Sequence, residues 1–581
     1  MSAASTHLIA RAPHPLAWLR AQPAAIATLI ILAIAAIAQI HWGTIDDVSW
    51  LITVGERVLD GQTPYVDFIE VNPPASILLY LPPILLARFV GCSPELMVTL
   101  FGFIGVAASL VLCAAILARA SLAEEVGWTG LALAAFVFFL LPGHTFNQRD
   151  PIALVAGLPL LAAFATRASS KSVDRTHAAL AGIGAGIMVS IKPHYGLIIL
   201  VTAPYLVWRL KRAVFTQWIE LYIAAAVGVA YLTVVVVFFP AFLTKILPLA
   251  ADVYLPDRMA LGDLLSRAGA RVWFALALLL MLLGRRRLGE PIVAVPALAS
   301  CGALACFLVQ GKGWPYQLYP ALALMVLASG VALRRSIREP AIALLSLNVF
   351  GAADALLMAF GYRLTAILAI MLFAVALGLV ASIGRAAPDL RGLSDRLEPL
   401  ASATLAGLAF GFMAFSFDHA ALSRALARLP PHPTMLEVSG NLTVGHPLVR
   451  EVGGVWVQSV CSLWITTSAW RLIAGHPNDV PLALKLAPYL EMDRAMLIGD
   501  ISRRRPDAIL ISNMGEDFTQ WAWSDPGVSA ALSDYRFFAT DENPNPNYET
   551  KIYVRSDLIG LRPALSEPSS ADGPGVDSQT Q

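Results

Sequence analysis

Charged residues are scarce in this chain of 581 residues. They make up 14% of it, against about 25% in an average soluble domain, whereas hydrophobic residues make up 57% and the mean hydropathy is +0.67. This composition excludes a soluble globular protein of ordinary type. The formal net charge of +1 gives no support to nucleic-acid binding, which favours a strongly basic surface.

Cysteine is also rare, and its positions show no metal-ligand spacing. A convincing small-residue cleavage site is missing near the amino terminus, where Arg11 and Arg20 precede a long apolar run. We therefore predict an uncleaved first membrane helix rather than a signal peptide. The five cysteines fall mostly in apolar segments and are predicted to be small core residues: Cys92, Cys113, Cys301, Cys306 and Cys461.

Apolar runs dominate the first 420 residues. Because a crossing helix needs about 20 predominantly apolar residues, these runs predict a polytopic α-helical membrane protein. They lie near 23–41, 72–91, 94–117, 127–143, 150–166, 177–192, 193–209, 217–239, 269–284, 291–309, 316–333, 340–360, 363–383 and 400–417. Basic clusters lie in every second connection between these runs, and the positive-inside rule places those connections in the cytoplasm. The clusters are Arg167/Lys171/Arg175, Arg209/Lys211/Arg212, Arg285/Arg286/Arg287, Arg334/Arg335/Arg338 and Arg385/Arg391/Arg396.

The number of crossings follows from parity. The connection near Asp150 and the acidic loop at 42–71 both fall outside, so an even number of crossings must separate them. The sequence offers three runs there, at 72–91, 94–117 and 127–143, so one run does not cross or two join. Pro82-Pro83 makes the first run the main suspect, because proline removes helix donors and kinks a span. The resulting count is about thirteen crossings.

The first outer loop, 42–71, belongs to a stretch with six carboxylates against a single arginine. Its first half has apolar residues at helical spacing, which predicts an amphipathic helix along the membrane surface. The pair Asp46-Asp47 stands at the start of that helix, where anions are favoured. The plainer alternative is that these acids only cap and solvate a surface helix.

The composition changes after residue 420. Residues 421–558 contain polar loops, turns and short strand-like runs at Met435–Val438, Asp507–Ser512, Tyr535–Ala539 and Lys551–Val554, with a helical stretch at 480–500. These features predict an extracytoplasmic α/β domain with its own core. The remaining tail, 559–581, is rich in Ser, Pro, Gly and Asp and is predicted to be disordered.

Short motifs in the acidic stretch resemble those of a known superfamily. An acid pair after the first span is followed by D-G-x-x-x-Y-x-D from Asp60 to Asp67, and then by E-x-N-P-P from Glu70 to Pro74. This arrangement resembles the GT-C superfamily of integral-membrane glycosyltransferases, which includes protein O-mannosyltransferases and the lipid A aminoarabinose transferase. The resemblance implies a GT-C-like membrane domain and a polyprenyl-phosphate sugar donor used on the outer face of the membrane.

The resemblance also implies roles for individual residues. Asp46 matches the first acid of the family's pair, the catalytic base, and Asp47 replaces the usual glutamate. Glu70 and Asn72 stand near the paired prolines, where family members often have Glu-Lys. The missing lysine departs from the family pattern for binding the donor phosphate. Glu70 and Asn72 remain candidate substrate-binding residues.

Sugar transfer from a lipid phosphate needs a base for the acceptor proton and cations for the departing phosphate. The outer connections supply cations, acids and aromatic side chains that are candidates for binding substrate. The alternatives are interfacial anchoring for the lysines, a local ion pair for Arg149-Asp150, hydrogen-bonded interfacial histidine and ordinary belt aromatics. The candidates are Arg149, Asp150, Lys192, His194, Lys312, Trp314 and Tyr316.

The sequence thus favours a glycosyltransferase of the bacterial cytoplasmic membrane, acting on an envelope glycan, lipid or protein. A transporter or flippase of lipid-linked sugars is the first alternative. Transporters tend to show internal repeats and mid-membrane charges, whereas this chain shows no repeat. An inactive GT-C-like assembly partner is the second alternative. The sequence assigns no cofactor and leaves a divalent cation open.

Overall fold

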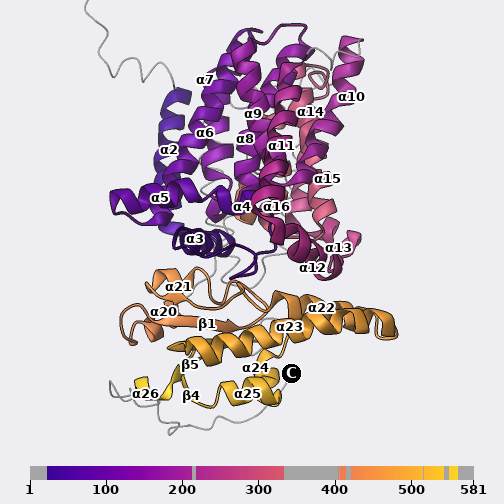
Figure 1. Cartoon of the computed structure of the whole chain (residues 1–581). Coiled ribbons are helices and arrows are strands. Elements are labelled where there is room, and N and C mark those ends of the chain that lie inside the picture. Colours follow the sequence, from indigo (N-terminus) through magenta and orange to yellow (C-terminus); the bar gives the residue numbers. More distant parts are fainter. Residues whose placement is uncertain are drawn as a thin grey trace, which may run out of the picture. The chain divides into compact units, whose positions relative to one another are not determined.

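The computed structural model describes residues 23–211, 218–332, 404, 406–413, 420–513, 516–541 and 549–559. The runs predicted at 340–360 and 363–383, most of 400–417, the basic clusters at 334–338 and 385–396, and residues 560–581 of the tail lie outside the described residues. The chain divides into two units, coloured indigo to magenta and orange to yellow in Figure 1. One comprises Met1–Phe417 with Arg471–Pro477, and the other comprises Asp418–Trp470 with Asn478–Gln581.

The first unit is helical. Within the described residues, six helices are long and apolar enough to cross a membrane. These are α2 (Pro23–Trp42), α6 (Pro94–Ala118), α8 (Arg149–Ala168), α11 (Ile219–Phe238), α15 (Pro291–Gln310) and α16 (Pro315–Ala332). Four shorter helices also coincide with predicted apolar runs: α7 (Leu122–Ala135), α9 (Arg175–Ile191), α10 (Gly196–Leu210) and α14 (Ala268–Leu283).

The run at 72–91 is the exception. It forms two short helices, α4 (Ala75–Leu78) and α5 (Leu81–Val90), and Pro82-Pro83 stand in the first turn of α5. Ten residues rise about 15 Å along a helix, which is half of the roughly 30 Å of bilayer hydrocarbon. In Figure 1, α5 lies across the direction of α6. Helix α5 is therefore too short to cross by itself.

Close helix packing holds α8 at the centre of this unit. All but three of its twenty residues are buried, and it packs against α6, α9, α15 and α16. A Cβ on Gly184 of α9 would lie 2.1 Å from the carbonyl oxygen of Ala156 on α8, so only glycine allows this approach. The first turn of α8 is therefore held in a fixed position relative to its neighbours.

Shorter elements connect these helices. The acidic stretch forms α3 (Asp46–Leu59), and α7 continues into the π-helix η1 (Phe136–Leu140) and the turn η2 (Gly143–Thr145). A second turn, η3 (Pro193–Tyr195), joins α9 to α10. Between α11 and α14 lie η5 (Phe242–Ile246), α12 (Leu247–Leu249), η6 (Ala250–Tyr254) and α13 (Leu261–Ser266).

The second unit contains a mixed five-stranded sheet in the order β2-β1-β3-β5-β4. Strands β2, β1 and β3 are parallel, and β5 is antiparallel to both β3 and β4. The predicted strands correspond to β1 (Thr434–Val438), β3 (Ala508–Ser512), β4 (Tyr535–Thr540) and β5 (Thr550–Arg555), whereas β2 (Val455–Trp456) was too short to predict. The helices are α20 (Ala420–Leu426), α21 (Leu448–Glu451), α22 (Trp464–Gly475), α23 (Val480–Arg504), α24 (Phe518–Ser524), α25 (Pro526–Ala531) and α26 (Ser556–Ile559).

Candidate functional site

The acid pair lies in the first turn of α3, as the sequence predicts. The N-cap is Ile45, and Oδ1 of Asp46 accepts a hydrogen bond of 2.9 Å from the backbone N–H of Asp47. Helix α3 packs against α4 and α5, and most of its residues are buried. A Cβ on Gly55 would lie 2.5 Å from Cδ1 of Ile84, so the two helices approach closely. The helix is thus packed into the protein, which fixes the position of its two carboxylates.

Asp47 is bound by residues at the start of α8. Nε2 of Gln148 donates to Oδ2 of Asp47 at 2.8 Å, and Nη2 of Arg149 lies 3.6 Å from Oδ1. Arg149 is buried and also donates to Oε1 of Gln148 at 3.2 Å and to Oγ of Ser76 at 3.4 Å. The carboxylate of Asp47 is therefore neutralised by a buried guanidinium.

Asp46 has no ion pair among the described residues. Burial, and after it the neighbouring carboxylate of Asp47, raise the pKa of Asp46 to about 7, although the charge of Arg149 acts to lower it. A carboxylate with a pKa near the working pH is a suitable general base. The two acids therefore differ in surroundings, as chemically distinct carboxylates in active sites do.

Glu70 and Asn72 bind each other. The backbone N–H of Asn72 donates to Oε1 of Glu70 at 2.7 Å, and the side-chain amide donates to the same oxygen. The indole N–H of Trp50 donates to Oε2 of Glu70, and the hydroxyl of Tyr65 donates to the carbonyl of Asn72 at 2.9 Å. Burial raises the pKa of Glu70 even though the charge of Arg149 lowers it. This network ties the loop that follows α3 to Trp50 of that helix.

Asp150 pairs with Lys192 rather than with its neighbour Arg149. Nζ of Lys192 lies 2.7 Å from Oδ2 of Asp150 and donates to Oε1 of Gln310 at 3.1 Å. The hydroxyl of Tyr195 donates to Oδ1 of Asp150 at 2.5 Å. The side chain of Asp150 is 0% exposed and that of Lys192 is 12% exposed. The alternative of a local Arg149–Asp150 ion pair is therefore wrong, and the start of α8 is tied to the ends of α9 and α15.

Lys312 is engaged by a different segment. Its Nζ donates to the carbonyl oxygens of Tyr254 at 2.7 Å and Asp257 at 2.5 Å, and lies 4.1 Å from the centre of the Tyr254 ring. Burial lowers the pKa of Lys312 to about 8. Lys312 thus anchors the segment after α12. Lys192 lies beside a different aromatic ring, with its Nζ 5.6 Å from the ring centre of Tyr316.

The remaining candidates differ in what they can offer a ligand. Burial, and after it the charge of Lys192, lower the pKa of His194 to about 4. A neutral imidazole gives no charge for holding phosphate. Trp314 is 40% exposed and its ring centre lies 5.6 Å from that of Tyr316, which is buried. Of these two rings, only Trp314 presents a partly open face.

The structure adds residues to which the sequence assigned no role. Gln148 and Gln310 connect the cations to the acids, Tyr195 binds Asp150, and Tyr254 with Asp257 holds Lys312. Gln148 and Gln310 lie close in sequence to the candidates Arg149 and Lys312. A polar side chain at the end of an apolar span was the sequence signal that could have identified both glutamines. In the parts of the chain that the structure describes, no group of three or more His, Cys, Asp or Glu residues could hold a metal ion.

Comparison with known proteins gives few matches. No protein-family model matches the sequence, and a search of curated proteins finds no match. Among solved structures, the chain is similar to ArnT from Cupriavidus metallidurans bound to undecaprenyl phosphate, with 15% identity and a TM-score of 0.47 over 94% of this chain and 100% of that one. The apo state of the same protein gives 15% identity and a TM-score of 0.46 over 92% and 99% of the two chains.

Proposed function

We propose that this chain is a membrane glycosyltransferase of the GT-C type. It moves a sugar from a polyprenyl-phosphate donor to a glycan, lipid or protein of the cell envelope, on the outer face of the cytoplasmic membrane. The observation that carries the proposal is the contrast between the two acids at the start of α3. Asp47 is neutralised by Arg149, whereas Asp46 has no ion pair among the described residues and has its pKa raised to about 7.

The chemistry assigns one step to each charge. Asp46 takes the proton of the acceptor hydroxyl as the oxygen attacks the anomeric carbon of the sugar. The bond between this carbon and the phosphate oxygen breaks, and its electron pair leaves with the polyprenyl phosphate. The negative charge that develops on the phosphate then needs a cation. The products are the glycosylated acceptor, polyprenyl phosphate and the proton held by Asp46.

Arg149 is the cation best placed to meet that phosphate. A guanidinium has five N–H donors, and the hydrogen bonds of Arg149 engage only Nε and Nη1 once each. Its distance of 3.6 Å from Asp47 is longer than a hydrogen bond. A phosphate could therefore bind without breaking a hydrogen bond of Arg149. Lys192 is a second candidate, and we assign Lys312 and His194 to positioning.

The remaining assignments follow from the same proposal. Glu70 and Asn72 position the acidic loop, and Trp314 offers a face on which a sugar can stack. The second unit lies outside the cytoplasm and selects the acceptor. These roles place the reaction centre in the helical unit.

One assay tests the function. The purified protein is reconstituted with a panel of polyprenyl-phosphate sugars and envelope acceptors, and the release of free polyprenyl phosphate is measured. We expect release with at least one donor, dependent on acceptor and lost in Asp46→Asn. Movement of intact lipid-linked sugar across vesicles, without release, would instead identify a transporter. If the protein neither released polyprenyl phosphate nor moved lipid-linked sugar, an inactive assembly partner would be the remaining function.

A further inference from the structure

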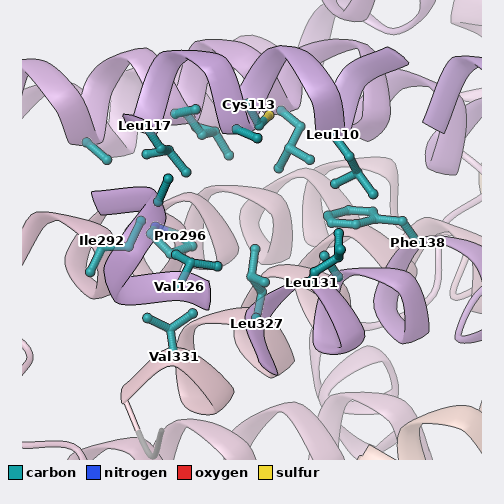
Figure 2. Close-up of a pocket in the computed structure, with 18 of the residues that line it drawn as sticks. Leu110, Cys113, Leu117, Val126, Leu131, Phe138, Ile292, Pro296, Leu327 and Val331 are labelled. Atoms are coloured by element: carbon teal, nitrogen blue, oxygen red, sulfur yellow. The ribbon is translucent and has the colours of Figure 1, made fainter. Parts of the chain in front are cut away.

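An apolar cavity of 380 Å³ lies within the helical unit, away from the site described above. Its wall is formed by residues of α6, α7, η1, α8, α15 and α16. Figure 2 shows the labelled side chains Leu110, Cys113 and Leu117 of α6 facing Leu327 and Val331 of α16. The volume is within the range of roughly 300–1,000 Å³ for small-ligand sites. Its lining is almost wholly aliphatic or aromatic, so it suits a hydrocarbon chain.

The cavity and the acidic site lie at different depths. On α8, the lining residues run from Leu158 to Ala165, nine to sixteen residues after Arg149. A rise of 1.5 Å per residue places them about 14–24 Å along the helix from Arg149. On α15 and α16, the lining residues Ile292 and Val331 likewise lie at the ends farther from Gln310 and Tyr316. The cavity thus belongs to the opposite half of the helical unit.

A break in α7 contributes to the cavity wall. Gly127 has φ 56° and ψ −169°, values that interrupt the helix and that a residue with a Cβ rarely adopts. Both Gly127 and Gly130 line the cavity, so no side chain from these positions fills it. At these two positions the cavity wall is backbone alone.

A basic loop lies at the same end of the helices. Nη1 of Arg287 donates to the carbonyl oxygen of Val331 at 2.6 Å, and Val331 lines the cavity. Arg287 is itself paired with Glu290 at 2.6 Å. Arg285 and Arg286 are exposed, and neither has an ion pair among the described residues. Two exposed positive charges therefore directly precede, in the chain, the arginine that contacts the cavity wall.

We propose that this cavity holds an acyl chain of an anionic phospholipid whose phosphate lies at Arg285 and Arg286. A hydrocarbon chain gains little by leaving the bilayer for an equally apolar cavity, because lipid tails are as apolar as leucine. Selectivity must then come from the headgroup. Basic residues at the ends of membrane helices favour anionic lipids, and a zwitterionic lipid with the same chains lacks the net charge that Arg285 and Arg286 select.

Native mass spectrometry tests the proposal. The full-length protein in mild detergent is mixed with phosphatidylglycerol and phosphatidylethanolamine of identical chains, and the retained lipids are compared. We expect preferential retention of phosphatidylglycerol. Arg285→Gln with Arg286→Gln should weaken its retention by about fivefold per arginine and leave phosphatidylethanolamine unchanged. Ala162→Trp, which fills the cavity from α8, should reduce the retention of both lipids.

Two matched controls accompany these variants. Lys171→Gln with Arg175→Gln removes the same charge at another basic connection, and Leu232→Trp adds an indole on the exposed face of α11. Both should retain phosphatidylglycerol as the unaltered protein does. If Ala162→Trp fails to fold, Ala114→Phe fills the cavity from α6. Equal retention of the two lipids by the unaltered protein, unchanged retention by a folded cavity-filling variant, or an equal loss in the charge control would overturn the proposal.

Discussion

Nη2 of Arg149 lies 3.6 Å from Oδ1 of Asp47, while Asp46, one residue earlier, has no ion pair among the described residues. This relationship gives two adjacent carboxylates different chemistry. The charge of Asp47 is balanced by Arg149 and by the hydrogen bond from Gln148. Asp46 keeps a basic carboxylate in a partly buried position, and its raised pKa suits a general base.

The first prediction separates the two acids. Asp46→Asn should lower the turnover of sugar transfer by about 10²–10⁴-fold, with little effect on folding, because no cation depends on this carboxylate. Asp47→Asn should lower turnover less. It should lower the free energy of unfolding by about 1–3 kcal/mol, because the buried Arg149 loses its ion-pair partner. Turnover and melting temperature are measured on the same samples. Near-normal turnover of Asp46→Asn would exclude its role as the base.

The second prediction concerns pH. Since burial and then the charge of Asp47 raise the pKa of Asp46 from 3.8 to about 7, the base is protonated and inactive below that pH. We expect kcat/KM to rise with pH and to level off above about 7. Asp47→Asn removes the repulsion between the carboxylates and should move the midpoint to lower pH, whereas Asp47→Glu should leave it near its original value. A midpoint that rises in Asp47→Asn would contradict the assignment.

The third prediction tests the orientation in the membrane. The basic connections predict that a cysteine at Arg286 is cytoplasmic and one at Ser533 is extracytoplasmic. A membrane-impermeant thiol reagent added to intact cells should therefore label Ser533→Cys and leave Arg286→Cys unmodified. Disruption of the cells should make Arg286→Cys reactive, which serves as the control. The reverse labelling pattern would place Asp46 on the cytoplasmic side.

Much of the helical unit could be predicted from local sequence. Apolar runs mark helices because a span must satisfy its backbone internally and present apolar side chains. The role of Pro82-Pro83 in stopping the run at 72–91 from crossing stays a prediction. The helix at Asp46–Leu59 was likewise predictable from its spacing. Its burial against α5 was not, because Gly55 meets Ile84 only through tertiary packing.

The pairing of the charges could not be predicted. Arg149 and Asp150 are adjacent, but successive residues of a helix point about 100° apart, so they face different neighbours. Asp150 meets Lys192 and Tyr195, which approach it only because α9 packs against α8. Lys312 was correctly placed at a helix border, but its two hydrogen bonds go to backbone carbonyls, which leave no mark in the sequence, and its ion pair with Asp257 at 3.6 Å depends on the fold.

The fourth prediction concerns Lys312. Lys312→Ala should remove two hydrogen bonds from the segment at Tyr254–Asp257 and increase hydrogen exchange there. The KM for the lipid donor should change by less than about threefold, since a direct charged contact would cost roughly tenfold or more. Lys245→Ala, at an exposed lysine of η5, is the control and should change neither quantity. A large rise in the KM for the lipid donor with unchanged hydrogen exchange would instead show that Lys312 binds the donor phosphate.

The last prediction concerns the buried pair of Asp150 and Lys192. Lys192→Met leaves a fully buried carboxylate with Tyr195 as its hydrogen-bond donor, and breaking such a pair costs about 3–5 kcal/mol. Asp150→Asn combined with Lys192→Met removes both charges and should recover much of this stability. Tyr195→Phe, which loses a single hydrogen bond, is the control and should be milder, at about 1 kcal/mol.

Donor use in these same variants then separates two roles of Lys192. If Lys192 only positions the start of α8, the double variant should regain donor binding together with stability, because Arg149 returns to its place. If Lys192 also binds the donor phosphate, the double variant should regain stability while its KM for the donor stays raised by roughly tenfold. Thermal unfolding and donor titration on one preparation give both values. The single variant Asp150→Asn completes the cycle, and a double variant whose loss of stability equals the sum of the two single losses would show that the pair is not coupled.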